Sequence, residues 1–263
     1  MTNDMNEELL AGGNVSDVYR LGDTIRRRLK PESARVHTLL QHLENKGYRY
    51  ASRFLGIDHK GREILSYIEG VAGHDPFNGY IWSDEALVEI ANMLRLYHDA
   101  VSDFSYKDDW PPIDNTPTNH EVLCHNDFAI YNIIFNHKKP VGIIDFDVAG
   151  PGPRLWDIAY TLYTCAPLSR LVYTENGEKT IYTASDHASH TKHRIQLFFD
   201  AYGEEVKEDF VQMVVRRLEG LCQLMTRKAH EGDPAFQKMI YEGHLEHYQK
   251  EIQFICKHGK DWF

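Results

Sequence analysis

The chain has 263 residues, 42% of them hydrophobic, so it is long enough for one large domain or two modest ones. Its 39 acidic side chains outnumber the 29 basic ones, and the resulting net charge of −10 argues against a nucleic-acid partner. No run approaches the ~18 apolar residues of a membrane span, residues 1–10 do not resemble a signal peptide, and the four cysteines are widely spaced. We therefore expect a cytoplasmic protein with no membrane partner.

The first 70 residues have the pattern of a small mixed unit. Short apolar runs within residues 9–29, separated by glycine turns, predict a hairpin. Apolar residues at helical spacing predict one helix over residues 31–46, and two further runs within residues 54–68 predict strands. The order expected for this part is therefore β-β-α-β-β.

After residue 70 the sequence is mainly helical, with one exception. Residues 121–149 contain short apolar runs separated by polar turns, which is typical of short strands and loops. No flexible linker separates the two parts, so the boundary near residue 70 is predicted to be a hinge. One helix is expected to begin at Ser83, and further helices are expected over residues 186–202, 207–228 and 234–256.

The segment with the clearest chemical meaning has the spacing H-x-D-x-x-x-x-N, from His125 through Asp127 to Asn132, followed by I-D-F-D with Asp145 and Asp147. Phosphoryl transfer needs a carboxylate to orient the attacking hydroxyl and oxygen ligands to hold Mg²⁺ against the phosphates. Asp127 is the candidate for accepting the proton of the hydroxyl, and Asn132 and Asp145 are the candidates for holding the metal. Asp147 is assigned to either the metal or the substrate.

Each of these residues also has an ordinary structural interpretation when it is taken alone. Asp and Asn commonly stabilise turns, and a histidine beside them can simply be packed in the core. Their joint spacing favours the catalytic interpretation. His125 is expected to support the loop, and Asp157 is expected to hydrogen-bond the backbone of the loop.

This block resembles the catalytic loop and metal-binding segment of the aminoglycoside phosphotransferase and choline kinase superfamily, whose members are relatives of protein kinases. The resemblance extends through residues 144–159 and covers most of the chain. It implies an α+β, protein-kinase-like fold. A small β-rich N-lobe with one main helix, residues 1–70, would bind the nucleotide, and a larger, mainly helical C-lobe, residues 71–263, would carry the catalytic loop and the acceptor site.

The same resemblance assigns phosphate-binding residues in the N-lobe. Gly12, Gly13 and Ser16 are similar to the glycine-rich loop that covers the phosphates, although an ordinary hairpin turn has the same composition. The strand where the family carries a phosphate-pairing lysine has no lysine. Strand alternation makes Arg27 the first candidate for this contact and Arg26 the second.

Two further N-lobe positions bear on the nucleotide site. The helix that offers a partner glutamate in the family carries Val36 and His37 instead. The segment from Ser66 to Ile68 resembles the hinge, whose backbone would hydrogen-bond the purine.

The predicted function is Mg²⁺-dependent transfer of the γ-phosphate of ATP or GTP to a hydroxyl of a small molecule. The resemblance implies a cationic acceptor, either an aminoglycoside-like antibiotic or an amino-alcohol. The alternative is a catalytically weak, pseudokinase-like nucleotide-binding regulator or immunity factor, which the missing lysine and glutamate would favour. Nucleotide preference, acceptor and oligomeric state stay open at this stage.

Overall fold

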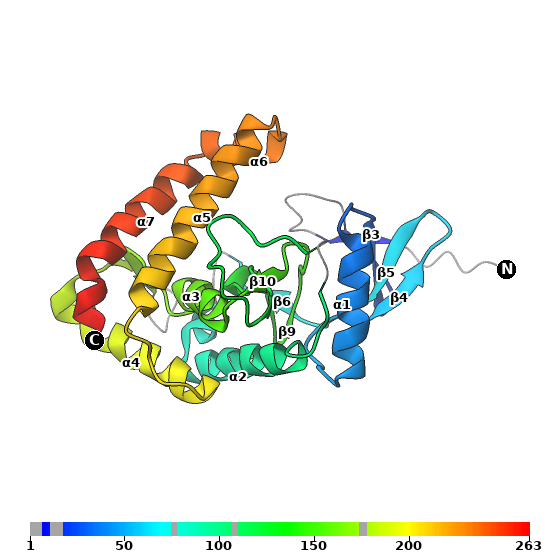
Figure 1. The fold of residues 1–263 in the computed structure, drawn as a ribbon. Helices are drawn as coiled ribbons and strands as arrows, with labels where there is room; N and C mark the ends of the chain where they lie inside the picture. Colours follow the sequence, from blue (N-terminus) through cyan, green and yellow to red (C-terminus); the bar gives the residue numbers. More distant parts are fainter. Residues whose placement is uncertain (1–6, 11–17, 75–77, 107–109, 174–177) are drawn as a thin grey trace.

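The computed structural model describes residues 7–10, 18–74, 78–106, 110–173 and 178–263 (Figure 1). The predicted glycine-rich loop residues Gly12, Gly13 and Ser16 lie outside these ranges. A β-sheet and one helix form the N-terminal end of the molecule, and helices dominate the other end (Figure 1). The α+β fold class expected from the sequence is therefore confirmed.

The N-terminal sheet has five antiparallel strands in the order β1-β2-β3-β5-β4. Helix α1, Ser33–Asn45, contacts the sheet at β4 and buries a face at helical spacing that includes Val36, Leu39, Leu40 and Leu43. Three strands precede this helix, one more than the sequence analysis expects, because Glu8–Leu10 forms a strand of its own that pairs with Val18–Leu21. The strands are β1 Glu8–Leu10, β2 Val18–Leu21, β3 Thr24–Arg28, β4 Phe54–Ile57 and β5 Arg62–Ser66.

Just after β5 the chain joins a different sheet. Strand β6, Val71–Ala72, pairs with β8, Ile133–Asn136, which pairs in turn with β9, Lys139–Ile143. A second small sheet joins β7, Val122–Cys124, to β10, Gly150–Gly152. The loops that carry the predicted catalytic residues therefore connect short, mostly buried strands. A lobe boundary at residue 70 stays a prediction.

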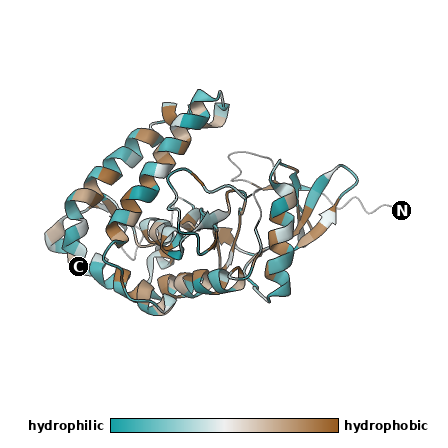
Figure 2. Cartoon of the chain, viewed as in Figure 1, coloured by the Kyte–Doolittle hydropathy of each residue, from teal (hydrophilic) through white to brown (hydrophobic). Residues whose placement is uncertain are grey.

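The helices after residue 83 are amphipathic, with alternating polar and apolar faces visible along their lengths (Figure 2). Helix α2, Asp84–Ala100, begins where the Ser83 side chain accepts a hydrogen bond from Ala86 N, and it buries Leu87, Ile90 and Leu94 in the core. Helix α2 packs against α4, and α5 packs against α3 and α7. The remaining helices are α3 Arg154–Cys165, α4 Ala184–Tyr202, α5 Phe210–His230, α6 Pro234–Tyr241 and α7 His244–His258, with 3₁₀ turns at Gly79–Trp82, Ile130–Asn132 and Gly259–Trp262.

Two expectations about the helical part need correction. The single helix predicted over residues 234–256 is two helices, because Gly243 adopts φ 87° and ends the first of them. Helix α3 and a hairpin formed by β11, Leu171–Tyr173, and β12, Lys179–Ile181, were not predicted individually. No helix among the described residues is long and apolar enough to cross a membrane.

Candidate active site

Asp127 lies at the centre of the site, in the loop after β7. Both of its carboxylate oxygens accept hydrogen bonds: the Tyr131 hydroxyl donates to Oδ1 at 2.5 Å, and Asn132 Nδ2 donates to Oδ2 at 2.7 Å. Asn132 Nδ2 also reaches the backbone carbonyl of Asp127, at 3.0 Å. The 3₁₀ turn over Ile130–Asn132 brings both donors back towards the carboxylate. The orientation of Asp127 is therefore fixed by its own loop.

Asp157 on α3 holds this loop through hydrogen bonds to its backbone. Its carboxylate accepts the backbone N–H groups of His125 and Asn126, each at 2.7 Å, and lies 3.1 Å from His98 Nε2. Burial alone would raise the pKa of Asp157, but the hydrogen bond from His98 and the positive charges nearby lower it below its ordinary value. The prediction that Asp157 hydrogen-bonds the loop backbone is confirmed. These bonds stabilise Asn126 at φ 65°, a left-handed conformation in the loop.

A second clamp on the loop comes from α5. Arg217 is buried, and its Nη2 donates to the backbone carbonyl of Asn126 at 2.5 Å. Its guanidinium lies 4.2 Å from the centre of the Tyr160 ring and 5.4 Å from that of Trp156, within the range of cation–π contacts. The loop that carries Asp127 is therefore held between α3 and α5.

Asn132 and Asp145 meet beside Asp127. The backbone N–H of Ile144 donates to the carbonyl of Asn132 at 3.0 Å, which puts Asp145 next to Asn132 in space. Asp145 has φ 67°, a strained conformation for a non-glycine residue. Burial and the nearby charge of Asp147 raise the pKa of Asp145 to about 7.

These groups fit a magnesium ion. The Asn132 amide donates through nitrogen, and its oxygen accepts no hydrogen bond from the residues that the structure describes. Two crowded carboxylates, at Asp145 and Asp147, favour a nearby cation. Over the described ranges no group of three or more His, Cys, Asp or Glu side chains is placed to hold a metal ion. Mg²⁺ is usually held by one or two protein carboxylates together with water and substrate phosphates.

Arg27 on β3 faces this acidic corner. Its Nη1 and Nη2 contact the Asp147 carboxylate at 3.1 and 2.9 Å, and Nη1 lies 3.5 Å from Asp145. Lys30 Nζ contacts the same Asp147 carboxylate at 2.5 Å. For Asp147 these two cations outweigh the effect of burial and lower its pKa. Asp147, assigned from sequence to metal or substrate, is thus paired with two cations in this structure.

Arg26 lies away from the site. Its Nη1 donates to Thr24 Oγ1 at 2.7 Å, and its Nε is 3.7 Å from Asp58, so its charge faces the opposite side of the sheet. In the segment predicted to be the hinge, Ser66 N donates to the carbonyl of Arg53. The Ser66 N–H is therefore already paired, whereas Ile68 has no backbone hydrogen bond to the residues that the structure describes.

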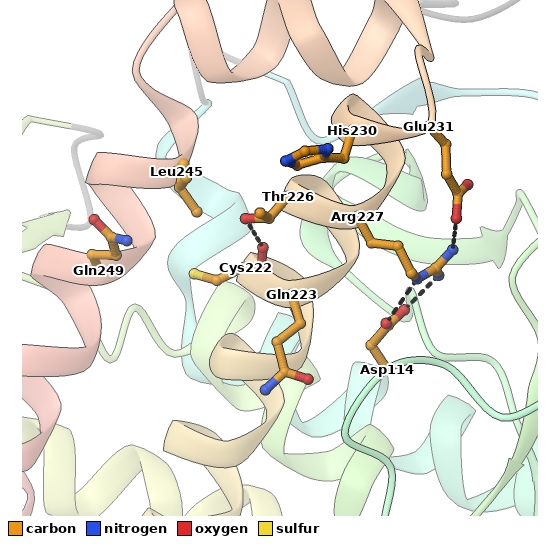
Figure 3. A pocket seen from close by; sticks show the side chains of 9 residues that line it. All are labelled: Asp114, Cys222, Gln223, Thr226, Arg227, His230, Glu231, Leu245 and Gln249. Atoms are coloured by element: carbon orange, nitrogen blue, oxygen red, sulfur yellow. Dashed lines mark hydrogen bonds and ion pairs between the residues drawn. The ribbon is translucent and has the colours of Figure 1, made fainter.

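A pocket of about 660 Å³ opens between α5, α7 and the loop that carries Asp114 (Figure 3). Arg227 on α5 binds Asp114 through two nitrogens, at 3.1 and 2.8 Å, and also contacts Glu231 at 2.9 Å. Tyr248 lies on α7 between the pocket residues Leu245 and Gln249. Burial and the charge of Asp127 raise the pKa of Tyr248, whose ring lies 6.4 Å from that of Tyr163 between centroids. The pocket residues are Asp114, Cys222, Gln223, Thr226, Arg227, His230, Glu231, Leu245 and Gln249.

Comparison with known proteins agrees with this geometry. Residues 105–189, which include the catalytic loop and the Asp145 segment, match the model of the phosphotransferase enzyme family. The chain is also 33% identical over 212 residues to a trifolitoxin immunity protein of Rhizobium leguminosarum bv. trifolii, covering 78% of this chain and 77% of that protein. The chain belongs to the phosphotransferase enzyme family.

Solved structures confirm the fold of this phosphotransferase family member. Aminoglycoside phosphotransferase APH(3'')-Id from Streptomyces rimosus, in complex with ADP and streptomycin, matches with a TM-score of 0.55 at 15% identity, covering 84% of this chain and 94% of that one. A choline/ethanolamine kinase family protein from Mesorhizobium loti matches with a TM-score of 0.57 at 14% identity, covering 95% of this chain and 92% of that one. At such identities the likeness concerns the fold.

Sequence reasoning missed four residues of the candidate site: Glu63, Lys30, Tyr131 and Arg217. Tyr131 lies inside the predicted motif, but its position in the sequence does not indicate a contact with Asp127. The 3₁₀ turn over Ile130–Asn132 directs its hydroxyl at the Asp127 carboxylate. Lys30 follows the arginine-rich strand and could have been considered as a second cation. Arg217 carries no local signal, since its partner lies 91 positions away.

The raised pKa of Asp145 predicts a pH dependence of stability in the metal-free protein. A carboxyl whose folded pKa, about 7, exceeds the ordinary value of 3.8 binds more protons in the folded chain, so its contribution to stability is lost as pH rises between these values. We expect the free energy of unfolding of wild type to fall relative to Asp145→Asn from pH 4 to 7, with little change above pH 8. Urea unfolding of both proteins without metal measures this. A difference that is independent of pH would contradict it.

The hydrogen bond from Tyr131 predicts a catalytic effect. Tyr131→Phe removes the hydroxyl that holds Asp127 Oδ1 and keeps the ring, so we expect kcat to fall about tenfold, the value of one bond to a charged group. The KM for nucleotide should not change. Steady-state kinetics measure both constants, and Tyr173→Phe, on the distant β11 strand, is the matched control. An unchanged kcat would show that Asn132 alone suffices to hold Asp127.

Proposed function

We propose that this protein transfers the γ-phosphate of ATP or GTP to a hydroxyl of a small, cationic molecule, such as an aminoglycoside-like antibiotic or an amino-alcohol, in the cytoplasm. The observation that carries the proposal is the convergence of three groups. Asn132 Nδ2 donates a hydrogen bond to the Asp127 carboxylate at 2.7 Å. The N–H of Ile144, the residue before Asp145, donates to the backbone carbonyl of Asn132. A carboxylate beside two oxygen donors is the arrangement that phosphoryl transfer requires.

In this proposal each residue has one task. Asp127 orients the acceptor hydroxyl and accepts its proton as the oxygen attacks the γ-phosphorus, while the bond from that phosphorus to the β,γ-bridging oxygen breaks and the nucleoside diphosphate leaves. Asn132 and Asp145 would hold Mg²⁺, which when bound neutralises charge on the phosphates. Arg27 would bind the phosphates as a planar, two-pronged donor, and the Ile68 backbone would bind the purine edge. We assign the glycine-rich loop, through Gly12, Gly13 and Ser16, to the phosphates as well.

The acceptor would enter through the pocket between α5 and α7. Tyr248 is next to the lining residue Gln249 on α7, and burial together with the charge of Asp127 raises the pKa of Tyr248, which supports an approach to Asp127 from this side. Among the lining residues of the pocket Asp114 and Glu231 oppose one arginine, so the local balance is slightly acidic. A slightly acidic pocket supports a cationic acceptor. The phosphotransferase of Streptomyces rimosus has been crystallised with ADP and streptomycin, which supports the same class.

The test is phosphate transfer from γ-labelled ATP and GTP, with Mg²⁺, to a panel of aminoglycosides, macrolides, choline and amino-alcohols. Wild type should label at least one acceptor, and Asp145→Ala should label none. Nucleotide binding without transfer to any acceptor would favour the second candidate described next. Failure of wild type to bind either nucleotide would overturn the proposal.

The second candidate is an immunity factor that binds nucleotide with little or no turnover. It is favoured by the 33% identity to the trifolitoxin immunity protein. The two candidates differ in what Asp127→Asn does to protection when the chain is expressed in a trifolitoxin-sensitive strain. Protection that survives the substitution would support the binding function, and protection that is lost while the protein stays folded would support an enzymatic one.

A further inference from the structure

Glu63 on β5 is a completely buried carboxylate that lies directly across from Arg27 in the N-terminal sheet. Its Oε1 accepts a hydrogen bond from Arg27 Nε at 2.5 Å, and its Oε2 lies 2.6 Å from His37 Nε2. An ionised carboxylate can only accept, so the imidazole nitrogen is the donor. Burial of an acid is costly unless its partners satisfy it, and here the partners come from β3 and α1.

The position of Glu63 follows from the register of the sheet. Arg27 on β3 and Glu63 on β5 are directly paired residues of neighbouring antiparallel strands, so their side chains emerge on the same face. The family resemblance leads one to expect a glutamate from the helix. In this chain the helix instead offers His37, whose ring stacks on Phe54 at 3.7 Å with an interplanar angle of 12°.

The guanidinium of Arg27 therefore contacts different partners through its Nε atom and through its two Nη atoms. Its Nε is bound to Glu63, inside the sheet, while Nη1 and Nη2 extend to Asp147 and lie near Asp145. A guanidinium bound only at its Nη atoms could rotate about its side-chain torsions. With Nε held, both Nη atoms point together into the corner that carries the predicted metal ligands.

We propose that Glu63 is the positioning residue for the phosphate-binding arginine, with His37 fixing the Glu63 carboxylate. The inference rests on the proposed nucleotide-binding function. It relocates the carboxylate partner of the phosphate-binding cation from the helix to a neighbouring strand. The cation–carboxylate pair is then assembled within one sheet, and α1 contacts the carboxylate through the His37 imidazole.

The experiment measures the affinity for Mg²⁺-ATP and Mg²⁺-GTP by calorimetric titration of the full chain. Glu63→Gln keeps the shape and removes the charge, and we expect Kd to rise about tenfold, as for loss of a hydrogen bond between charged groups. The double variant Arg27→Gln/Glu63→Gln should bind no more weakly than Arg27→Gln alone, because both substitutions disable the same contact. Glu44→Gln, an exposed acid on α1, is the matched control and should leave Kd unchanged.

His37→Phe provides an independent variant in case Glu63→Gln does not fold. It keeps the stacking on Phe54 and loses the donor to Glu63, so we expect a smaller rise in Kd, about threefold, with a cooperative thermal transition. Wild type that binds no nucleotide would refute the proposed function itself. Wild type that binds, together with Glu63→Gln and His37→Phe of equal affinity, would overturn the inference alone. Effects of Glu63→Gln and Arg27→Gln that simply add would also overturn it, because Glu63 would then act independently of Arg27.

Discussion

Asp127→Asn is expected to reduce turnover by about 10²–10⁴-fold, the usual contribution of a positioned general base. The amide has nearly the same shape, but it cannot take the proton of an acceptor hydroxyl. One of its two positions would also present an N–H group to the Tyr131 hydroxyl or to Asn132 Nδ2. Nucleotide affinity should be retained, because the phosphate-binding and hinge residues are untouched. Single-turnover phosphate transfer and nucleotide titration on the same preparation measure the two quantities.

Asp186→Asn is the control for this first prediction, since Asp186 is an exposed acid at the start of α4 that bonds Thr183. A loss of nucleotide binding in Asp127→Asn in parallel with turnover would indicate that the loop had collapsed. Turnover equal to wild type in a folded protein would remove Asp127 from the mechanism and would leave the binding function as the better account.

Arg27→Gln should raise the KM for nucleotide by roughly ten- to hundredfold, since bonds from a cation to an anionic ligand are each worth about 1.5–3 kcal/mol. It should also lower stability by about 3–5 kcal/mol, because Glu63 would remain buried without its charged partner. Arg27→Lys should recover only part of the affinity, since one ammonium cannot contact Glu63 and Asp147 in the geometry of the guanidinium. Nucleotide titration and urea unfolding measure the two effects.

Arg26→Gln is the matched control for the second prediction, because Arg26 lies on the same strand and faces Asp58 on the other side of the sheet. It should leave the KM for nucleotide near the wild-type value. If Arg26→Gln weakened nucleotide binding more than Arg27→Gln, the phosphate contact would have to be reassigned to Arg26.

The sequence predicts the cluster of Asp127, Asn132 and Asp145 for a local reason, whereas the fold class comes from the resemblance of that motif to a known family. These residues lie within 19 positions of one another, joined by one pair of adjacent strands, so spacing alone brings them together. Glu63 could not be found in the same way. The length of chain between β3 and β5 does not set their register, and only the register reveals that Glu63 pairs with Arg27.

The corrections to the helical part have similar causes. Residues 234–256 keep an apolar periodicity throughout, and the break depends on one backbone dihedral angle at Gly243 rather than on the pattern. The extra strand before α1 is three residues long, too short for alternation to mark it. Long, strongly periodic segments were therefore predicted well, and short or interrupted ones were not.

The contact between Arg217 and the carbonyl of Asn126 joins residues 91 positions apart. During synthesis the loop that carries Asp127 leaves the ribosome long before α5 does. Of its two supports, Asp157 is therefore available first, and Arg217 is added only when the last third of the chain has been made. Partial chains that stop before residue 217 would retain the whole motif from His125 to Asp147 and yet lack one of its two supports. The loop that carries Asp127 is thus fully supported only late in the synthesis of the chain. We therefore expect frameshifts between the motif and residue 217 to inactivate the protein as effectively as changes within the motif.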